Sequence, residues 1–146
     1  MLRRLLRPRD LSLADLLLLP QLILSALALR SCLRMVSLPR LTRLLARGAQ
    51  TTRLRRLPFL HGRRDIERLA RLADLATRLT HGRGRCLPRS LLLFWLLKTR
   101  EEPVELLVGV QRESGSLEGH AWIERRGALF GDSPGLTGRY AALLRF

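Results

Sequence analysis

The chain has 146 residues and a formal net charge of +15, because 27 lysines and arginines outnumber 12 aspartates and glutamates. This length suits one hydrophobic core and leaves little room for a second independent domain. We therefore treat residues 1–49, an expected helical region, and residues 50–146 as parts of one continuous domain. The positive charge favours an acidic partner, although a strong arginine bias is equally typical of a GC-rich genome. Aromatic residues are only 5% of the chain, and no zinc-finger spacing or helix-turn-helix pattern occurs, so we expect no nucleic-acid partner.

The N-terminus has some features of a signal peptide. Residues Met1–Asp10 are basic and residues Leu16–Leu29 are mostly apolar, which is the order found in exported proteins. However, Asp15 precedes the apolar run and Pro20 lies inside it. The run is also too short to span a bilayer and is more typical of a buried helix. We therefore expect a cytoplasmic protein without stable membrane insertion, with export as the alternative.

Leucine-rich helices are predicted for the first third of the chain. Ser12 and Asp15 are typical of a helix start, and Pro20 should limit or kink that helix. A second helix is expected from Leu22 to Val36, ending before the Leu38-Pro39 step. An apolar stripe with arginines beside it then continues to Gly48; the arginines are Arg40, Arg43 and Arg47. We interpret these helices as core-packing elements, and a docking surface is the alternative.

The middle of the chain predicts a connector and two further helices. Residues Gln50–Arg64 have mixed polarity and form the expected connector. Apolar residues recur at helical spacing from Asp65 to His81. A new segment begins at Cys86 and is apolar nearly all round, which is typical of a buried central helix. Because Pro88 is tolerated only in the first turn of a helix, this helix should begin within a residue or two of Cys86.

The last third of the chain predicts a small sheet. Strands are expected at Val104–Arg112, His120–Glu124 and Ala128–Asp132, followed by a short helix around Tyr140–Leu144. With the helices before it, this pattern predicts an α+β fold, in which the central cysteine-bearing helix packs on a small antiparallel sheet.

Two cysteines, Cys32 and Cys86, do not make a disulfide scaffold. A thiol at a helix N-terminus is stabilised as the thiolate by the helix dipole and by backbone N–H groups. The same N–H groups can supply part of an oxyanion hole. Arg85 and Arg89 add positive charge near Cys86. We therefore predict that Cys86 is a nucleophile, whereas an inert buried thiol is the better interpretation of Cys32, which lies among leucines.

A cysteine nucleophile needs an imidazole base, and three histidines are available. His61 falls in the connector, and His81 lies next to a flexible glycine-containing segment. We predict His120 as the base because of its place in a hairpin.

A three-residue loop at Arg125-Arg126-Gly127 would set His120 opposite Asp132, and Trp122 opposite Phe130. Asp132 would then orient the imidazole. A two-residue turn at Arg126-Gly127 would break this pairing. Turn chemistry in Gly131–Pro134 is the alternative role for Asp132.

These residues resemble a known family. The block Cys86-Leu87-Pro88-Arg89-Ser90-Leu91 and the block Gly119-His120-Ala121-Trp122-Ile123-Glu124, together with Phe94–Leu97, Gly109-Val110 and Asp132, resemble the lasso-peptide leader peptidases. These enzymes are transglutaminase-like cysteine proteases. The close match covers roughly residues 82–134.

The resemblance implies a transglutaminase/papain-like fold for residues 50–146 and a Cys86, His120, Asp132 triad. It also implies cleavage of a precursor peptide at its leader–core junction, before a cyclase closes the macrolactam. Some family members carry a fused leader-recognition domain ahead of the protease. We interpret this chain as the stand-alone protease form, which acts with a separate leader-recognition protein. No cofactor or metal is implied.

Two other interpretations stay open at this point. A transglutaminase-like acyl transferase would form the same thioester and pass it to an amine instead of water. A non-enzymatic basic helical protein that binds a membrane or nucleic acid would owe its triad to chance.

Overall fold

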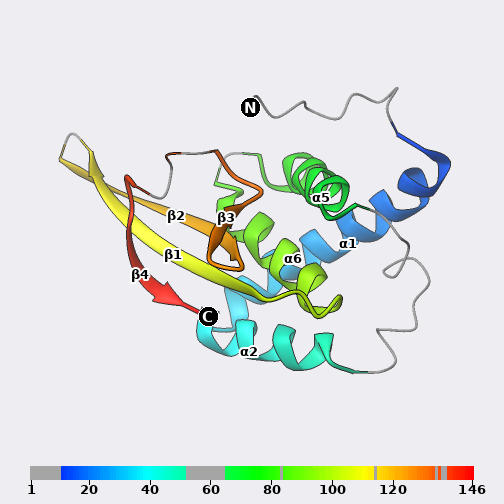
Figure 1. The fold of residues 1–146 in the computed structure, drawn as a ribbon, viewed down its shortest axis with the longest axis horizontal. Coiled ribbons are helices and arrows are strands. Elements are labelled where there is room, and N and C mark those ends of the chain that lie inside the picture. Colours follow the sequence, from blue (N-terminus) through cyan, green and yellow to red (C-terminus); the bar gives the residue numbers. More distant parts are fainter. Residues whose placement is uncertain (1–10, 52–64, 83, 114, 134, 136–137) are drawn as a thin grey trace.

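The computed structural model describes residues 11–51, 65–82, 84–113, 115–133, 135 and 138–146. Within these residues the fold is α+β, as predicted, with helices and a four-stranded antiparallel sheet in two layers (Figure 1). The helices are α1 (Leu13–Met35), α2 (Leu38–Ala49), α5 (Ile66–His81) and α6 (Cys86–Lys98). The strands are β1 (Val104–Glu113), β2 (Ser116–Arg125), β3 (Ala128–Phe130) and β4 (Ala141–Arg145), in the spatial order β3-β2-β1-β4.

Helix α6 lies at the centre of the molecule, between the sheet and the other helices (Figure 1). It contacts α1, α2 and α5 as well as β1 and β2. Its composition explains this position, because an apolar residue faces nearly every direction around the helix. The buried apolar side chains are Leu91, Leu92, Leu93, Phe94, Leu96 and Leu97. Pro88 falls in the first turn, so the predicted helix start at Cys86 is confirmed.

Helix α1 is one continuous helix, which corrects two expectations. Its N-terminus is a capping box, in which the Ser12 hydroxyl accepts from the backbone of Asp15 and the Asp15 carboxylate accepts from the backbone of Ser12. Pro20 lies inside the helix and does not end it, so the predicted division into two helices is wrong. A proline costs one backbone hydrogen bond, and packing compensates for it along a buried stripe made of Leu18, Leu22, Ala26 and Leu29.

The continuous helix also removes the length argument against membrane insertion. By length and composition alone, the 23 residues of α1 are enough to cross a membrane, and 22% of its most apolar window is buried. The core helix of a soluble protein and a signal sequence satisfy the same criterion. A structural feature opposes insertion: Asp15 is fully buried and accepts hydrogen bonds from the guanidinium of Arg68 on α5. The absence of stable membrane insertion stays a prediction.

The next two helices begin and end close to their predicted bounds. The backbone is extended at Val36 and Ser37, and α2 then starts with Pro39 in its first turn. Helix α5 has the Asp65 carboxylate as its cap and ends at His81. Most of the predicted connector, residues 52–64, lies outside the described residues, as does His61.

The C-terminal segment is a strand, so the helix predicted around Tyr140–Leu144 is wrong. Strand β4 pairs with β1, and Leu106 and Phe146 exchange backbone hydrogen bonds of 3.0 and 2.9 Å. Alanine and leucine favour a helix in isolation, but that preference is weak. The unpaired edge of β1 offers a ladder of hydrogen bonds, which outweighs it.

The turn between β2 and β3 has two residues, so the predicted three-residue loop is wrong. Arg126 and Gly127 have φ angles of 53° and 76°, as a type I′ turn requires, and this turn matches the right-handed twist of the paired strands. The register pairs Arg125 with Ala128 and Ile123 with Phe130. The predicted pairings of Trp122 with Phe130 and of His120 with Asp132 are therefore wrong as well.

Candidate active site

Cys86 is the first residue of α6 and is partly exposed. The approach to it contains Gly82 and Gly84, whose φ angles of 55° and 78° bend the chain into the helix. The first N–H groups of a helix have no acceptor within that helix. The N–H of Leu87 lies within hydrogen-bonding reach of the Cys86 thiol and lowers its pKa. The helix start therefore places both the thiol and free backbone donors at one end of the central helix.

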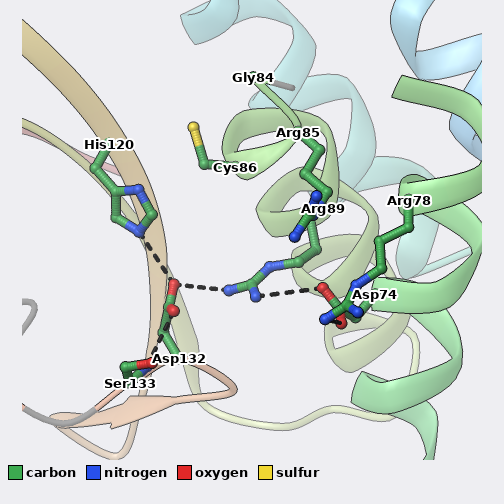
Figure 2. Close-up of a pocket in the computed structure, with 9 residues that line it drawn as sticks. All are labelled: Asp74, Arg78, Gly84, Arg85, Cys86, Arg89, His120, Asp132 and Ser133. Carbon is green, nitrogen blue, oxygen red and sulfur yellow. Dashed lines mark hydrogen bonds and ion pairs between the residues drawn. The ribbon is translucent and has the colours of Figure 1, made fainter. Parts of the chain in front are cut away.

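His120 faces Cys86 from strand β2 (Figure 2). Its Nε2 atom lies 3.0 Å from Oδ2 of Asp132, which leaves Nδ1 for the thiol. The imidazole also stacks on Trp122 at 6.3 Å between ring centroids, and Tyr140 lies 5.2 Å away on the same measure. Strand β2 begins at Ser116, so His120 lies well inside a strand and not at its start. Aromatic packing thus fixes the plane of the imidazole ring.

Asp132 reaches His120 from a loop and not from a paired strand. Strand β3 ends at Phe130, and Gly131 then adopts a φ of 72°, which turns the chain. Oδ2 of Asp132 accepts hydrogen bonds from His120 and, at 2.7 Å, from Arg89. Oδ1 accepts from the backbone N–H of Ser133 at 3.0 Å. The structure thus brings the three predicted residues together, although the register that led to the choice of Asp132 is wrong.

The three groups shift one another's pKa values. The interaction with His120 is the main reason that the pKa of Cys86 falls below its usual value of 9.0, against the opposing effect of burial. The hydrogen bond to Asp132 is the main reason that the pKa of His120 rises to about 9. Burial opposes ionisation of Asp132, but the hydrogen bond from His120 and the charge of Arg89 outweigh it, and its pKa falls to about 2. Compared with isolated groups, the arrangement therefore favours the thiolate of Cys86, the imidazolium of His120 and the carboxylate of Asp132.

Helix α6 also contacts the strand that carries His120. The Ser90 hydroxyl donates a hydrogen bond of 2.9 Å to the backbone carbonyl of Ala121. This carbonyl is accessible because β3 pairs with β2 only between Ile123 and Arg125. The backbone N–H of Ala121 in turn helps to lower the pKa of Cys86. Ser90 therefore joins the two layers next to the reacting groups.

Sequence reasoning missed an ionic network behind Asp132. Arg89 is 7% exposed and lies between two carboxylates, with Nη2 at 2.7 Å from Asp132 and Nη1 at 3.7 Å from Asp74. Asp74 also pairs with Arg78 at 2.7 Å. The sequence indicates Arg89 only as a positive charge near Cys86, and it assigns no role to Asp74. The sequence offers one signal for Arg89: it lies three residues after Cys86 and therefore on the same face of α6.

A pocket of about 430 Å³ opens beside the thiol. It is lined by Asp74, Arg78, Gly84, Arg85, Cys86, Arg89, His120, Asp132 and Ser133 (Figure 2). The lining is polar and brings together residues of α5, α6, β2 and the loop after β3. The pocket is open to solvent, and the basic side chains Arg78 and Arg85 lie at its helical side.

Two other residues considered from the sequence, His81 and Cys32, do not line this pocket. Nδ1 of His81 lies 2.7 Å from the hydroxyl of Thr80 at the end of α5. Cys32 packs against the hydrophobic core, which agrees with its interpretation as an inert thiol. Neither cysteine forms a disulfide.

Comparison with known proteins identifies a family. A model of the transglutaminase-like superfamily matches residues 26–145, from the middle of α1 to the end of β4. No curated protein and no solved structure gives a significant match. The superfamily includes cysteine proteases and acyltransferases. Because the match covers most of the chain and includes the whole Cys86–His120 site, the protein belongs to the transglutaminase-like superfamily.

Proposed function

We propose that the protein is a papain-like cysteine protease that removes the leader from a lasso-peptide precursor before the macrolactam forms. The observation that carries the proposal is the position of the Cys86 thiol opposite His120, with Asp132 on the far side of the imidazole (Figure 2). The sequence blocks around Cys86 and His120, which resemble those of the leader peptidases, support the choice of substrate.

The proposed reaction begins with the thiolate of Cys86. It attacks the carbonyl carbon at the leader–core junction, and the backbone N–H groups at the start of α6 stabilise the oxyanion. The imidazolium of His120 donates its proton to the departing amine, so the core is released and the leader stays on sulfur as a thioester. A water molecule then gives a proton to His120 and attacks the thioester. The leader leaves as a carboxylic acid, which loses its proton to solvent, and the thiolate of Cys86 and the imidazolium of His120 are restored.

Asp132 has a supporting role in this scheme. Its carboxylate accepts the Nε2–H of His120 at 3.0 Å, which holds the imidazole with Nδ1 toward sulfur. It also stabilises the imidazolium that donates the proton. The carboxylate itself stays ionised, since the charge of Arg89 and the hydrogen bond from His120 lower its pKa.

The proposal includes a separate leader-recognition protein, and it extends to the macrolactam-forming cyclase as a second partner and to a cytoplasmic location. The basic side chains Arg40, Arg43 and Arg47 recur on α2 and are exposed. Their charge suits an acidic surface on the recognition protein or on the leader. We infer that this arginine face, defined as Arg40, Arg43 and Arg47, docks the recognition protein–leader complex.

Mass spectrometry of a candidate precursor tests the function. Wild-type protein, with the recognition protein present, should give two fragments whose masses sum to the precursor plus one water. The Cys86→Ala variant should give none. An acyl transferase would instead give a product joined to an added amine without gain of water. Equal results for wild type and Cys86→Ala would contradict any enzymatic role for this site.

A further inference from the structure

The loop that carries Asp132 has little support from the sheet. Strand β3 pairs with β2 over three residues only, and the last pair is Phe130 with Ile123. Beyond Gly131 the register no longer determines where a side chain points. Among the residues that the structure describes, the polar contacts of the Asp132 carboxylate are His120, Arg89 and the backbone N–H of Ser133. The backbone contact is local, so Arg89 is the partner that ties this carboxylate to the helical layer.

We propose that Arg89 is a positioning residue, which holds Asp132 against His120 from one turn beyond the nucleophile, while Asp74 holds Arg89. The role rests on the proposed chemistry of Cys86. The positioning role adds to that chemistry, because it assigns a separate function to the Arg89–Asp74 pair (Figure 2).

Burial makes this guanidinium well suited to such a role. A buried cation is costly unless carboxylates compensate for it. Arg89 has two, at 2.7 Å from Asp132 and 3.7 Å from Asp74. A planar guanidinium can contact both at once, whereas a lysine ammonium can satisfy one such position at a time. The guanidinium therefore fixes the spacing between α5 and the loop after β3.

The shared oxygen gives Arg89 a second effect. Arg89 and His120 both contact Oδ2 of Asp132, so the guanidinium holds the same carboxylate oxygen that orients the imidazole. Loss of Arg89 should let Asp132 leave His120 and should remove a positive charge near the thiolate. Both changes destabilise the thiolate, so both raise the pKa of Cys86.

The test measures Cys86 reactivity without any peptide, so it does not depend on the leader being the substrate. In a Cys32→Ala background, the rate of alkylation by iodoacetamide is followed against pH. The groups around the thiol are Arg85 and Arg89 of α6, His120 of β2, Asp132 and Ser133 of the loop, and Asp74 and Arg78 of α5. Only the two variants of Arg89 change a member of this set; Arg68→Gln and Cys32→Ala leave it unchanged.

For Arg89→Gln we expect the midpoint of the alkylation profile to rise by about one pH unit. Arg89→Lys keeps the positive charge but loses the planar guanidinium that contacts both carboxylates. Its alkylation midpoint should therefore lie between those of wild type and Arg89→Gln. Arg68→Gln is the matched control, because it breaks another ion pair between helices, with the buried carboxylate of Asp15, and neither residue lines the pocket. It should lower stability and leave the midpoint unchanged.

An unchanged midpoint in Arg89→Gln would overturn the proposal. Full recovery by Arg89→Lys would also overturn it, because charge alone would then suffice. If Arg89→Gln does not fold, Arg89→Lys decides the question: a profile identical to wild type contradicts the positioning role, and an intermediate shift supports it. With an active precursor assay, Arg89→Lys should lower kcat by about tenfold with little change in KM.

Discussion

His120 and Trp122 stack with their ring planes 13° apart, on the same face of β2. The indole is 2% exposed, and its far edge lies over Gly109 of β1, the residue that pairs with His120. A Cβ on Gly109 would lie 2.6 Å from the carbonyl oxygen of Ala141 and 2.8 Å from the indole. Gly109 therefore provides the space in which Trp122 supports the imidazole.

Gly109→Ala should therefore destabilise the protein and reduce catalysis together. The added methyl must displace either β4 or the indole, and overpacking of this kind costs about 2 kcal/mol in the free energy of unfolding. Chemical denaturation measures the loss. Gly119→Ala is the matched control on β2, because its Cβ would meet only the Gly109 carbonyl, at 4.0 Å. Equal stability of the two variants would contradict the packing account.

The pH dependence of peptide cleavage should be bell-shaped. On the acid side the rate rises as Cys86 ionises, and this limb lies below the usual thiol value of 9.0 because His120 lowers the pKa. On the alkaline side the rate falls near pH 9, where His120, its pKa raised mainly by Asp132, loses the proton that the leaving amine needs. Asp132→Asn should lower the pKa of His120, so the alkaline limb of the rate profile should move to lower pH. A profile that keeps its alkaline limb in Asp132→Asn would contradict this assignment.

The Asp15–Arg68 pair should make stability depend on pH in the acid range. The hydrogen bond from Arg68 is the main reason that the pKa of Asp15 lies well below its usual 3.8, against the effect of burial. A lowered folded-state pKa contributes stability above the unfolded value, and this contribution is lost as the pH falls below it. Asp15→Asn should therefore cost about 2 kcal/mol in the free energy of unfolding at pH 7.

The difference between wild type and Asp15→Asn should shrink as the pH falls from 5 toward 3. Urea denaturation at several pH values measures it, and Asp65→Asn, at the exposed cap of α5, is the control. A difference that stays constant over this range would show that the ionised carboxylate does not contribute.

Charge reversal of the arginine face tests the docking proposal. Replacing Arg40, Arg43 and Arg47 by glutamate should weaken binding of the recognition protein–leader complex by about a hundredfold at low salt, and the loss should shrink as salt screens the charges. Calorimetry or fluorescence anisotropy measures the affinity. Iodoacetamide alkylation of Cys86 should not change, which separates docking from chemistry. Unchanged affinity would mean that the complex binds elsewhere.

The sequence predicts the helical half of the site well. Pro88 tolerates only the first turn of a helix, so it determines where α6 begins and hence that Cys86 lies at its N-terminus. The nearly uniform apolar composition of α6 predicts its central position. Both signals are local, which is why a single sequence suffices to find them.

The sheet half is harder to predict because its geometry depends on pairing. A turn of two residues and a turn of three residues give different strand registers. The two-residue turn requires a positive φ at Arg126, and arginine is not a residue type from which a positive φ is predicted. The predicted register that pairs Asp132 with His120 does not form. Asp132 reaches His120 instead because the chain bends at Gly131 and because Arg89 binds its carboxylate. The strand identity of β4 depends on the free edge of β1, and the continuity of α1 through Pro20 depends on packing against α5 and α6.

The two-layer arrangement has a consequence for how the chemistry can be lost. Sulfur belongs to the helical layer and imidazole to the sheet, and the thickness of the leucine packing beneath α6 determines how far apart they lie. Leu93 and Leu97 are buried and follow Ser90 at helical spacing on the face of α6 that contacts β2, so we expect these leucines to keep the two layers at the distance that proton transfer requires. A variant that kept its secondary structure but lost this tight leucine packing would retain Cys86, His120 and Asp132. We expect it to lose activity, because the sulfur and the imidazole would no longer be held at a fixed distance.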